Sequence, residues 1–162
     1  MLTCMGQSCT YRLDASSIPL EMKTINVQFF ENNAPLVVNN LSQDFTESLK
    51  DRIRSQTRLS ITRGEADATF SGNIVGYSIA PISVQATNTT TAPPIATGSR
   101  LTITVNVKYL LIGKFDKKFN FEQSFSRYAD FTGDIGNKEQ ALITNINKQL
   151  TEDIFNKAFA NW

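Results

Sequence analysis

The chain has 162 residues, of which 41% are hydrophobic and 19% charged, a composition typical of one globular domain with its own core. Its 16 basic and 15 acidic residues nearly balance, which argues against a dedicated nucleic-acid-binding protein with a strong basic excess. Histidine is absent, so the most common general acid–base residue and metal ligand is missing. No stretch is long and apolar enough to predict a transmembrane helix.

Both cysteines, Cys4 and Cys9, lie near the start of the chain. The apolar and then small residues before Cys9 are typical of the end of a bacterial lipoprotein signal peptide, which is cut directly before the lipidated cysteine. We therefore expect residues 1–8 to be the remnant of a signal peptide, Cys9 to be the lipid attachment site, and residues 9–22 to form a lead segment before a single domain over residues 23–162. Cys4 is a competing site, and incidental thiols or a disulfide that closes a short loop are the alternatives.

The first part of the domain is predicted to be a strand followed by a helix. Hydrophobic and polar residues alternate over residues 23–31, the pattern of a half-buried strand. Apolar residues then recur every four positions, as on one face of a helix: Leu41, Phe45, Leu49 and Ile53. Asn40 is the predicted N-cap, with Gln43 in the position of a capping box, and the helix is predicted to end near residues 56–57.

A long strand and a long loop are predicted next, after a short β-like run at residues 59–62. The strand covers residues 68–84 and changes phase beside Gly72 and Gly76, which predicts a bulge or a sharp bend. Residues 85–99 are rich in Thr, Ala, Asn and Pro and form a predicted exposed hairpin loop. This loop is either a surface loop without a role or a segment that becomes ordered against a partner.

The remaining elements complete an α+β domain. Residues 100–113 have one continuous apolar face and form the strongest predicted strand, and a turn leads to a last strand over residues 119–129. A second helix is predicted from about residue 137 to residue 161. The order of strand, helix, three strands and helix predicts a two-layer sandwich, with both helices packed on one face of a four-stranded mixed sheet.

Sequence patterns that carry catalysis or hold cofactors are missing. The chain has no phosphate-binding glycine loop, no dinucleotide-binding fingerprint and no spaced cysteine or histidine cluster, and a Ser-His-Asp triad requires histidine. Carboxylate pairs such as Glu152 and Asp153 are interpreted as solvated helix-surface residues. We therefore expect no enzymatic activity, no cofactor and no metal, and an enzyme that uses carboxylates or Ser and Lys alone is the remaining alternative.

One part of the chain has a local surplus of positive charge. Six cations stand there against two acidic residues, and these cations are Arg100, Lys108, Lys114, Lys117, Lys118 and Arg127. At one tip or on the solvent face of a β-hairpin they would attract phosphates or anionic headgroups. The alternative is that they keep an exposed hairpin soluble and prevent aggregation at its edge.

Short segments in a fixed order along nearly the whole chain resemble a known family. They include Cys9-Thr-Tyr-Arg-Leu13, Lys23-Thr-Ile-Asn-Val27, Gly72-Asn-Ile-Val-Gly-Tyr77, Arg100-Leu-Thr-Ile-Thr-Val105 and Phe121-Glu-Gln-Ser-Phe-Ser-Arg-Tyr-Ala-Asp130. This ordered set resembles the LptE family of lipopolysaccharide-assembly lipoproteins, of the kind found in Bacteroidetes-type bacteria.

The resemblance implies a lipoprotein of the outer membrane that faces the periplasm and is acylated at Cys9, for example with palmitate. It implies an LptD-type β-barrel and lipopolysaccharide as partners, with the chain partly plugging the barrel and helping lipopolysaccharide to reach the cell surface. From charge alone, we expect the six cations to contact lipopolysaccharide. The alternative function is a generic cell-envelope lipoprotein that acts as a structural or scaffold module without lipid transport.

Overall fold

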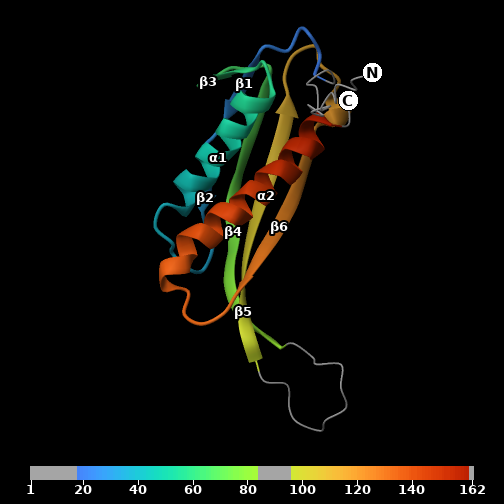
Figure 1. The fold of residues 1–162 in the computed structure, drawn as a ribbon. Helices are drawn as coiled ribbons and strands as arrows, with labels where there is room; N and C mark the ends of the chain where they lie inside the picture. Colours follow the sequence, from blue (N-terminus) through green and yellow to red (C-terminus); the bar gives the residue numbers. More distant parts are fainter. Residues whose placement is uncertain (1–17, 84–95, 161–162) are drawn as a thin grey trace, which may run out of the picture.

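The computed structural model describes residues 18–83 and 96–160 (Figure 1). The predicted lipid attachment site Cys9, the competing Cys4 and most of the predicted loop over residues 85–99 lie outside the described residues. The lipid anchor and the role of the loop therefore stay predictions.

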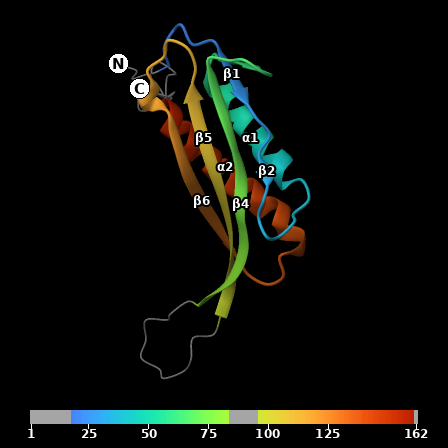
Figure 2. The ribbon, with the colours of Figure 1, turned by 180° about the vertical axis from the view of Figure 1, so that it is seen from behind.

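Two layers make up the domain, a mixed β-sheet and a pair of helices that cover one of its faces (Figures 1 and 2). The strands are β1 (Thr24–Val27), β2 (Glu31–Asn32), β3 (Ser60–Thr62), β4 (Ala68–Ser83), β5 (Ala96–Leu111) and β6 (Phe121–Phe131), and the helices are α1 (Leu41–Gln56) and α2 (Glu139–Phe159). The strand order is β3-β1-β4-β5-β6, with β2 beside β4. β1 runs parallel to β3 and β4, whereas β4, β5 and β6 form an antiparallel meander.

The predicted α+β sandwich with both helices on one face is confirmed, but the sheet has six strands and not four. The strand predicted over residues 23–31 is divided into β1 and the two-residue β2, and the β-like run predicted at residues 59–62 forms the three-residue β3. Two or three residues are too few to show a period in the sequence, because a strand is recognised by alternation over four or more positions. Their pairing depends on contacts with β1 and β4, which are distant in the chain.

Helix α1 has the predicted bounds and the predicted buried stripe, but its predicted N-cap is wrong in detail. Asn40 stands at the N-cap position in a left-handed conformation (φ 66°) and makes no capping hydrogen bond with its side chain. Its backbone oxygen accepts a hydrogen bond from Asp44 N at 2.8 Å. The capping box between Asn40 and Gln43 is therefore not formed, and burial of the apolar stripe is what holds the helix in place.

The β4–β5 ladder is the centre of the core. The inward side chains of β5 are all 0–3% exposed: Leu101, Ile103, Val105, Val107, Tyr109 and Leu111. The register shifts between Ile74 and Gly76, where the sequence predicted a bulge. Gly72 has a φ of 155°, and a Cβ atom there would overlap the carbonyl oxygen of Asn106, so only glycine allows the two strands to approach this closely.

Candidate functional site

The turn between β5 and β6 brings three of the six predicted cations together. Lys114, Lys117 and Lys118 are exposed there, the last two on a short 3-10 helix (Lys117–Phe119). Asp116 caps this helix, because its Oδ1 accepts a hydrogen bond from Lys118 N at 3.0 Å, and its Oδ2 lies 3.1 Å from Lys118 Nζ. These hydrogen bonds hold the pKa of the Asp116 carboxyl below its ordinary value. Lys114 and Lys117 form no ion pair with any described residue.

Two further cations reach this end of the sheet from the other half of the chain. Arg58 precedes β3 and donates from Nη2 to the backbone oxygens of Ile18 and Pro19, both at 3.0 Å. Lys23 precedes β1, and its backbone N–H donates to Asp67 Oδ2 at 2.8 Å. Lys23 and Arg58 are both exposed. We call the set Lys23, Arg58, Lys114, Lys117 and Lys118 the basic end.

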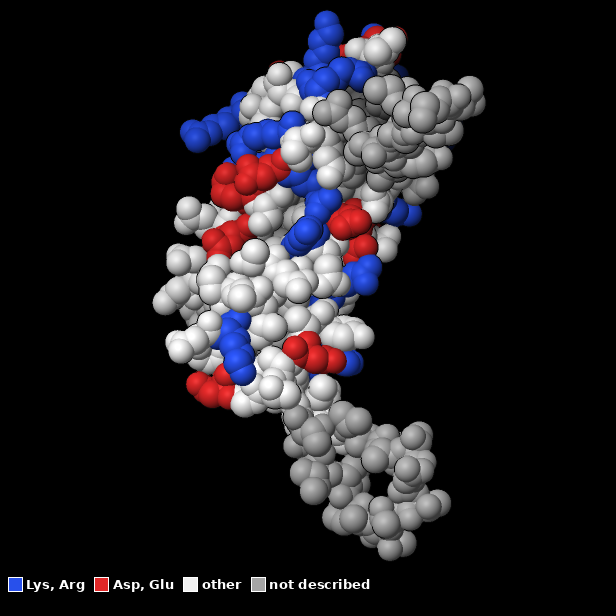
Figure 3. All heavy atoms as spheres, in the orientation of Figure 1, with Lys and Arg blue, Asp and Glu red and all other residues white. Residues whose placement is uncertain are grey.

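Asp67 links the two halves of the basic end. Its Oδ2 accepts hydrogen bonds from the backbone N–H groups of Lys23 and Thr24 and from the Thr24 hydroxyl. The backbone hydrogen bonds, with a smaller contribution from the nearby charge of Lys114, hold the pKa of the Asp67 carboxyl below its ordinary value. Figure 3 shows Lys and Arg side chains more frequently in the upper half of the view, which is the end of the molecule where the β5–β6 turn lies.

Sequence reasoning missed the contribution of Lys23 and Arg58 to this site. Both are far in sequence from the β5–β6 turn, and the parallel pairing of β1 with β3 and β4 is what brings them to the same end. Because β1 and β4 are parallel neighbours, the residues that precede these two strands lie at the same end of the sheet. The sequence pattern alone did not specify that pairing.

The structure separates the other three predicted cations and gives each an acidic partner. Arg100 donates to both carboxylate oxygens of Asp130 at 2.6 and 2.9 Å, and its guanidinium carbon lies 3.8 Å from the ring centroid of Tyr128. Arg127 donates to both oxygens of Asp153 on α2 at 2.6 and 2.7 Å. Lys108 Nζ lies 3.8 Å from Glu122 Oε2.

These three cations also lie on different faces of the hairpin. In the β5–β6 register Lys108 and Arg100 alternate with the buried residues of β5, so they lie on the face without helices. Arg127 is opposite the buried Ile103 and reaches α2 on the other face. The six predicted cations therefore do not form one patch, and the three at the β5–β6 turn are the ones that lie together.

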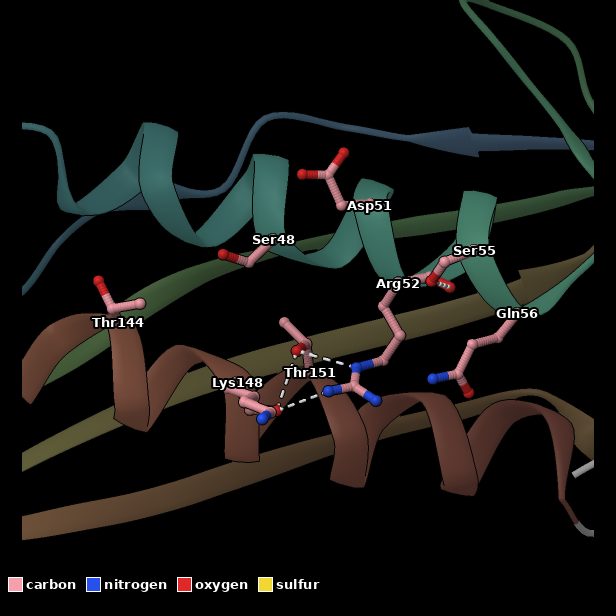
Figure 4. A pocket seen from close by; sticks show the side chains of 8 residues that line it. All are labelled: Ser48, Asp51, Arg52, Ser55, Gln56, Thr144, Lys148 and Thr151. Carbon is pink, nitrogen blue, oxygen red and sulfur yellow. Dashed lines mark hydrogen bonds between the residues drawn. The ribbon is translucent and has the colours of Figure 1, made fainter. Parts of the chain in front are cut away.

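A groove lined by polar and charged residues lies between α1 and α2 on the outer side of the molecule (Figure 4). Its volume is about 450 Å³, and it is lined by Ser48, Asp51, Arg52, Ser55, Gln56, Thr144, Lys148 and Thr151. Arg52 crosses it and donates to Thr151 Oγ1 at 3.2 Å and to the Lys148 backbone oxygen at 3.1 Å. Since these hydrogen bonds join the two helices, the main role of Arg52 is structural.

A metal centre and a transmembrane helix are both absent from residues 18–83 and 96–160. Within these ranges no group of three or more His, Cys, Asp or Glu side chains is arranged to hold a metal ion. In the same ranges no helix is sufficiently long and apolar to cross a membrane.

Comparison with known proteins decides the family. The family model of LptE, described as lipopolysaccharide-assembly, matches residues 22–158. The chain belongs to the LptE family. This membership confirms the family predicted from the sequence, and it gives the chain a role in lipopolysaccharide assembly at the cell envelope, which is not an enzymatic role. No curated protein matches the chain.

Solved structures with the same fold have little sequence in common with this LptE-family chain. A minor lipoprotein from Acinetobacter baumannii is 12% identical, with a TM-score of 0.53 over 86% of this chain and 94% of that one. A hypothetical protein from Chlamydia trachomatis is 11% identical, with a TM-score of 0.56 over 85% of this chain and 96% of that one. An uncharacterized lipoprotein B from Nitrosomonas europaea is 15% identical, with a TM-score of 0.50 over 96% and 92%. At these identities the similarity shows the fold alone.

Proposed function

We propose that the chain is an outer-membrane lipoprotein, acylated at Cys9 and facing the periplasm, that plugs and assists an LptD-type β-barrel in assembling lipopolysaccharide. The observation that carries the proposal is the match of the LptE family model over residues 22–158, which spans the sheet and nearly all of α2.

The basic end is the proposed contact for lipopolysaccharide. Lys114 and Lys117 are exposed and have no carboxylate partner among the described residues, so both ammonium groups are available to phosphates. Ammonium groups bind phosphate as point charges, and several of them around one anion act together. Arg100, Lys108 and Arg127, which the sequence also suggested, would have to break an existing ion pair before binding.

Binding of purified lipopolysaccharide to the immobilised chain tests this contact. The variant Lys114→Glu/Lys117→Glu should weaken binding by about tenfold or more at physiological salt, because two attractive charges become repulsive. The matched control is Lys148→Glu/Lys157→Glu, which makes the same change in net charge on the exposed surface of α2. Equal weakening by both variants would show binding through net charge and would contradict a contact at the basic end.

Lipidation at Cys9 is tested by intact mass of the protein recovered from its native cells. A mature chain that begins at Cys9 and carries acyl chains is expected, and each buried CH₂ of these chains contributes about 0.8 kcal/mol of membrane binding. The variant Cys9→Ala should lose the acyl mass, whereas Cys4→Ala should retain it. An unprocessed chain without acyl groups would contradict the anchor.

The barrel partnership is tested by affinity purification of the tagged chain from detergent-solubilised envelopes. We expect a large β-barrel protein to co-purify and to be identified by mass. Recovery of the chain as a lone monomer from such extracts would instead favour the generic envelope lipoprotein. The ion pairs of Arg100, Lys108, Lys118 and Arg127 fit that second function, because they would then only stabilise and solubilise the hairpin.

A further inference from the structure

Strand β4 continues to Ser83, beyond the ends of β1 and β2, which are its neighbours on the side away from β5. β2 pairs with β4 at Asn73 and Ile74, and the last backbone hydrogen bond on this side joins Asn33 N to Ile74 O at 2.8 Å. From there to Ser83 the only strand of the described chain that pairs with β4 is β5. This part of the hairpin extends past both helices, at the end of the sheet opposite the β5–β6 turn (Figures 1 and 2). We call residues 78–83 of β4 the free edge.

The free edge is exposed and carries no charge. Residues 78–81 are all exposed, and the Ile79 side chain is 42% accessible to solvent. No Lys, Arg, Asp or Glu occurs anywhere in residues 68–99, although charged residues make up 19% of the chain. Proteins usually protect an edge strand with charged side chains, prolines or bulges. The free edge has Pro81 and a register shift between Ile82 and Ser83, but it has no charged side chain.

The other long edge of the sheet is protected by charged side chains. β6 has 11 residues and is the last strand of the sheet order. It carries Glu122, Arg127 and Asp130, all of which are in ion pairs. Of these two edges, only the free edge of β4 combines exposed aliphatic side chains with an absence of charge.

Pro81 shows which backbone groups of the free edge face outward. Proline has no N–H to donate, so within a ladder it occupies a position whose nitrogen points away from the partner strand. Pro81 is opposite Ser99 of β5, and its nitrogen therefore faces the open side. Because outward positions alternate, Ile79 also directs its N–H and C=O to the open side.

An extended polypeptide is the partner that fits such an edge. Hydrocarbon cannot hydrogen-bond to outward N–H and C=O groups, so insertion of a strand edge into lipid is unfavourable. A strand added in register satisfies these groups and lets neighbouring side chains pack on Ile79. An uncharged strand suits this edge, because a charge buried against Ile79 without a partner would be strongly unfavourable.

We propose that the free edge of β4 docks, by strand addition, an extended and uncharged segment of the partner β-barrel protein that is not paired within the closed barrel wall. The inference rests on the proposed barrel partnership and assigns it a surface on this chain. The lack of an N–H donor at Pro81 limits the pairing to a short stretch beside Ile79. The added strand therefore buries little surface area, and its main effect is to fix where the partner docks.

Photo-crosslinking in native cells tests the assignment. A photoreactive amino acid replaces Ile79 on the free edge in one variant and Ser126 on the β6 edge in the matched control. The expected result is an adduct with the mass of the barrel protein from position 79 and none from position 126. If the barrel co-purifies but position 79 gives no adduct, or position 126 gives an equal one, the free edge is not the docking surface. An adduct of position 79 with a second copy of the chain would also overturn it.

A pair of isoleucine substitutions gives a second measurement. Ile79→Lys places a charge on the free edge, whereas Ile112→Lys places the same charge on an isoleucine of similar exposure (50% against 42%) beside the β5–β6 turn. We expect Ile79→Lys to reduce co-purification of the barrel at least fivefold and Ile112→Lys to leave it unchanged. Equal effects would overturn the inference, and failure of the unmodified chain to retain any barrel would instead overturn the proposed function itself.

Discussion

The two ends of the sheet differ in how they meet solvent. At the basic end, Asp116 caps the short helix of the β5–β6 turn and Asp67 accepts hydrogen bonds from the backbone of Lys23 and Thr24, so the exposed lysines stand on a hydrogen-bonded backbone. At the opposite end, β4 exposes backbone and aliphatic side chains without any charge. A net charge of +1 conceals this segregation. This difference indicates that the basic end is suited to an anionic ligand in water, whereas the free edge is suited to a partner that excludes water.

Two glycines of the β4–β5 ladder test whether the body and the free end differ in rigidity. Gly72→Ala should lower the free energy of unfolding by about 3 kcal/mol or more, because the new Cβ overlaps Asn106 O and Phe30 at a positive φ. At Gly98 the nearest atoms, Phe131 O and Ile82 Cδ1, lie at 3.1 and 3.3 Å from an added Cβ, so Gly98→Ala should cost about 1 kcal/mol or less. Urea unfolding of both variants measures the difference, and equal costs would contradict it.

Two buried tyrosines, one in each half of the ladder, should respond with opposite signs. The Tyr77 hydroxyl donates to Glu139 Oε1 at 2.6 Å, so Tyr77→Phe should lower stability by about 1 kcal/mol. The Tyr109 hydroxyl is buried with no hydrogen-bond partner among the described residues, so Tyr109→Phe should raise stability by about 1 kcal/mol. Burial raises the pKa of both phenols, so neither effect should change near neutral pH. Thermal unfolding of the two variants decides the sign of each effect.

Asp67 gives the basic end a dependence of stability on pH. Its carboxyl pKa is lowered in the folded chain, so the stabilisation is present above the unfolded pKa of about 4 and is lost as the pH falls through the folded value. Asp67→Asn should therefore cost about 1 kcal/mol at pH 7, a value reduced by partial exposure to solvent, and progressively less below about pH 4. Urea midpoints of both chains between pH 7 and pH 3 check this, and a constant difference would contradict it.

Pro81→Thr is the smallest expected change in stability and restores an N–H on the free edge. Stability should change by less than about 0.5 kcal/mol, because the proline nitrogen faces away from β5. Self-association measured by light scattering should increase, since an uninterrupted edge pairs more readily with another strand. Scattering identical to that of the unmodified chain would show that Pro81 does not limit pairing at this edge.

Elements long enough to repeat a hydrophobic pattern several times were predictable from the sequence, whereas very short elements that form only through contacts with distant strands were not. The four-residue spacing of Leu41, Phe45, Leu49 and Ile53 gave α1 its bounds, and the alternation along β5 gave its buried face. β2, with two residues, has no period of its own and forms because Glu31 meets Asn73. The predicted capping box was wrong because the sequence pattern does not reveal backbone conformation. Asn40 is left-handed, and its side chain makes no capping hydrogen bond.

The candidate site was only half predictable for a related reason. Charge counting found Lys114, Lys117 and Lys118 because they are neighbours in the sequence, and it included Arg100 and Arg127 for the same reason. Whether a cation already has a carboxylate partner depends on strand register and on α2, which brings Asp153 to Arg127. The addition of Lys23 and Arg58 depends on parallel pairing between distant strands.

One series of measurements tests most directly whether the two ends serve two partners. The variants Lys114→Glu/Lys117→Glu and Ile79→Lys are each assayed for lipopolysaccharide binding and for co-purification of the barrel from envelopes. The account predicts that the first variant loses lipopolysaccharide and retains the barrel, whereas the second loses the barrel and retains lipopolysaccharide. Loss of both partners to the same extent in both variants, with each still folded, would contradict it.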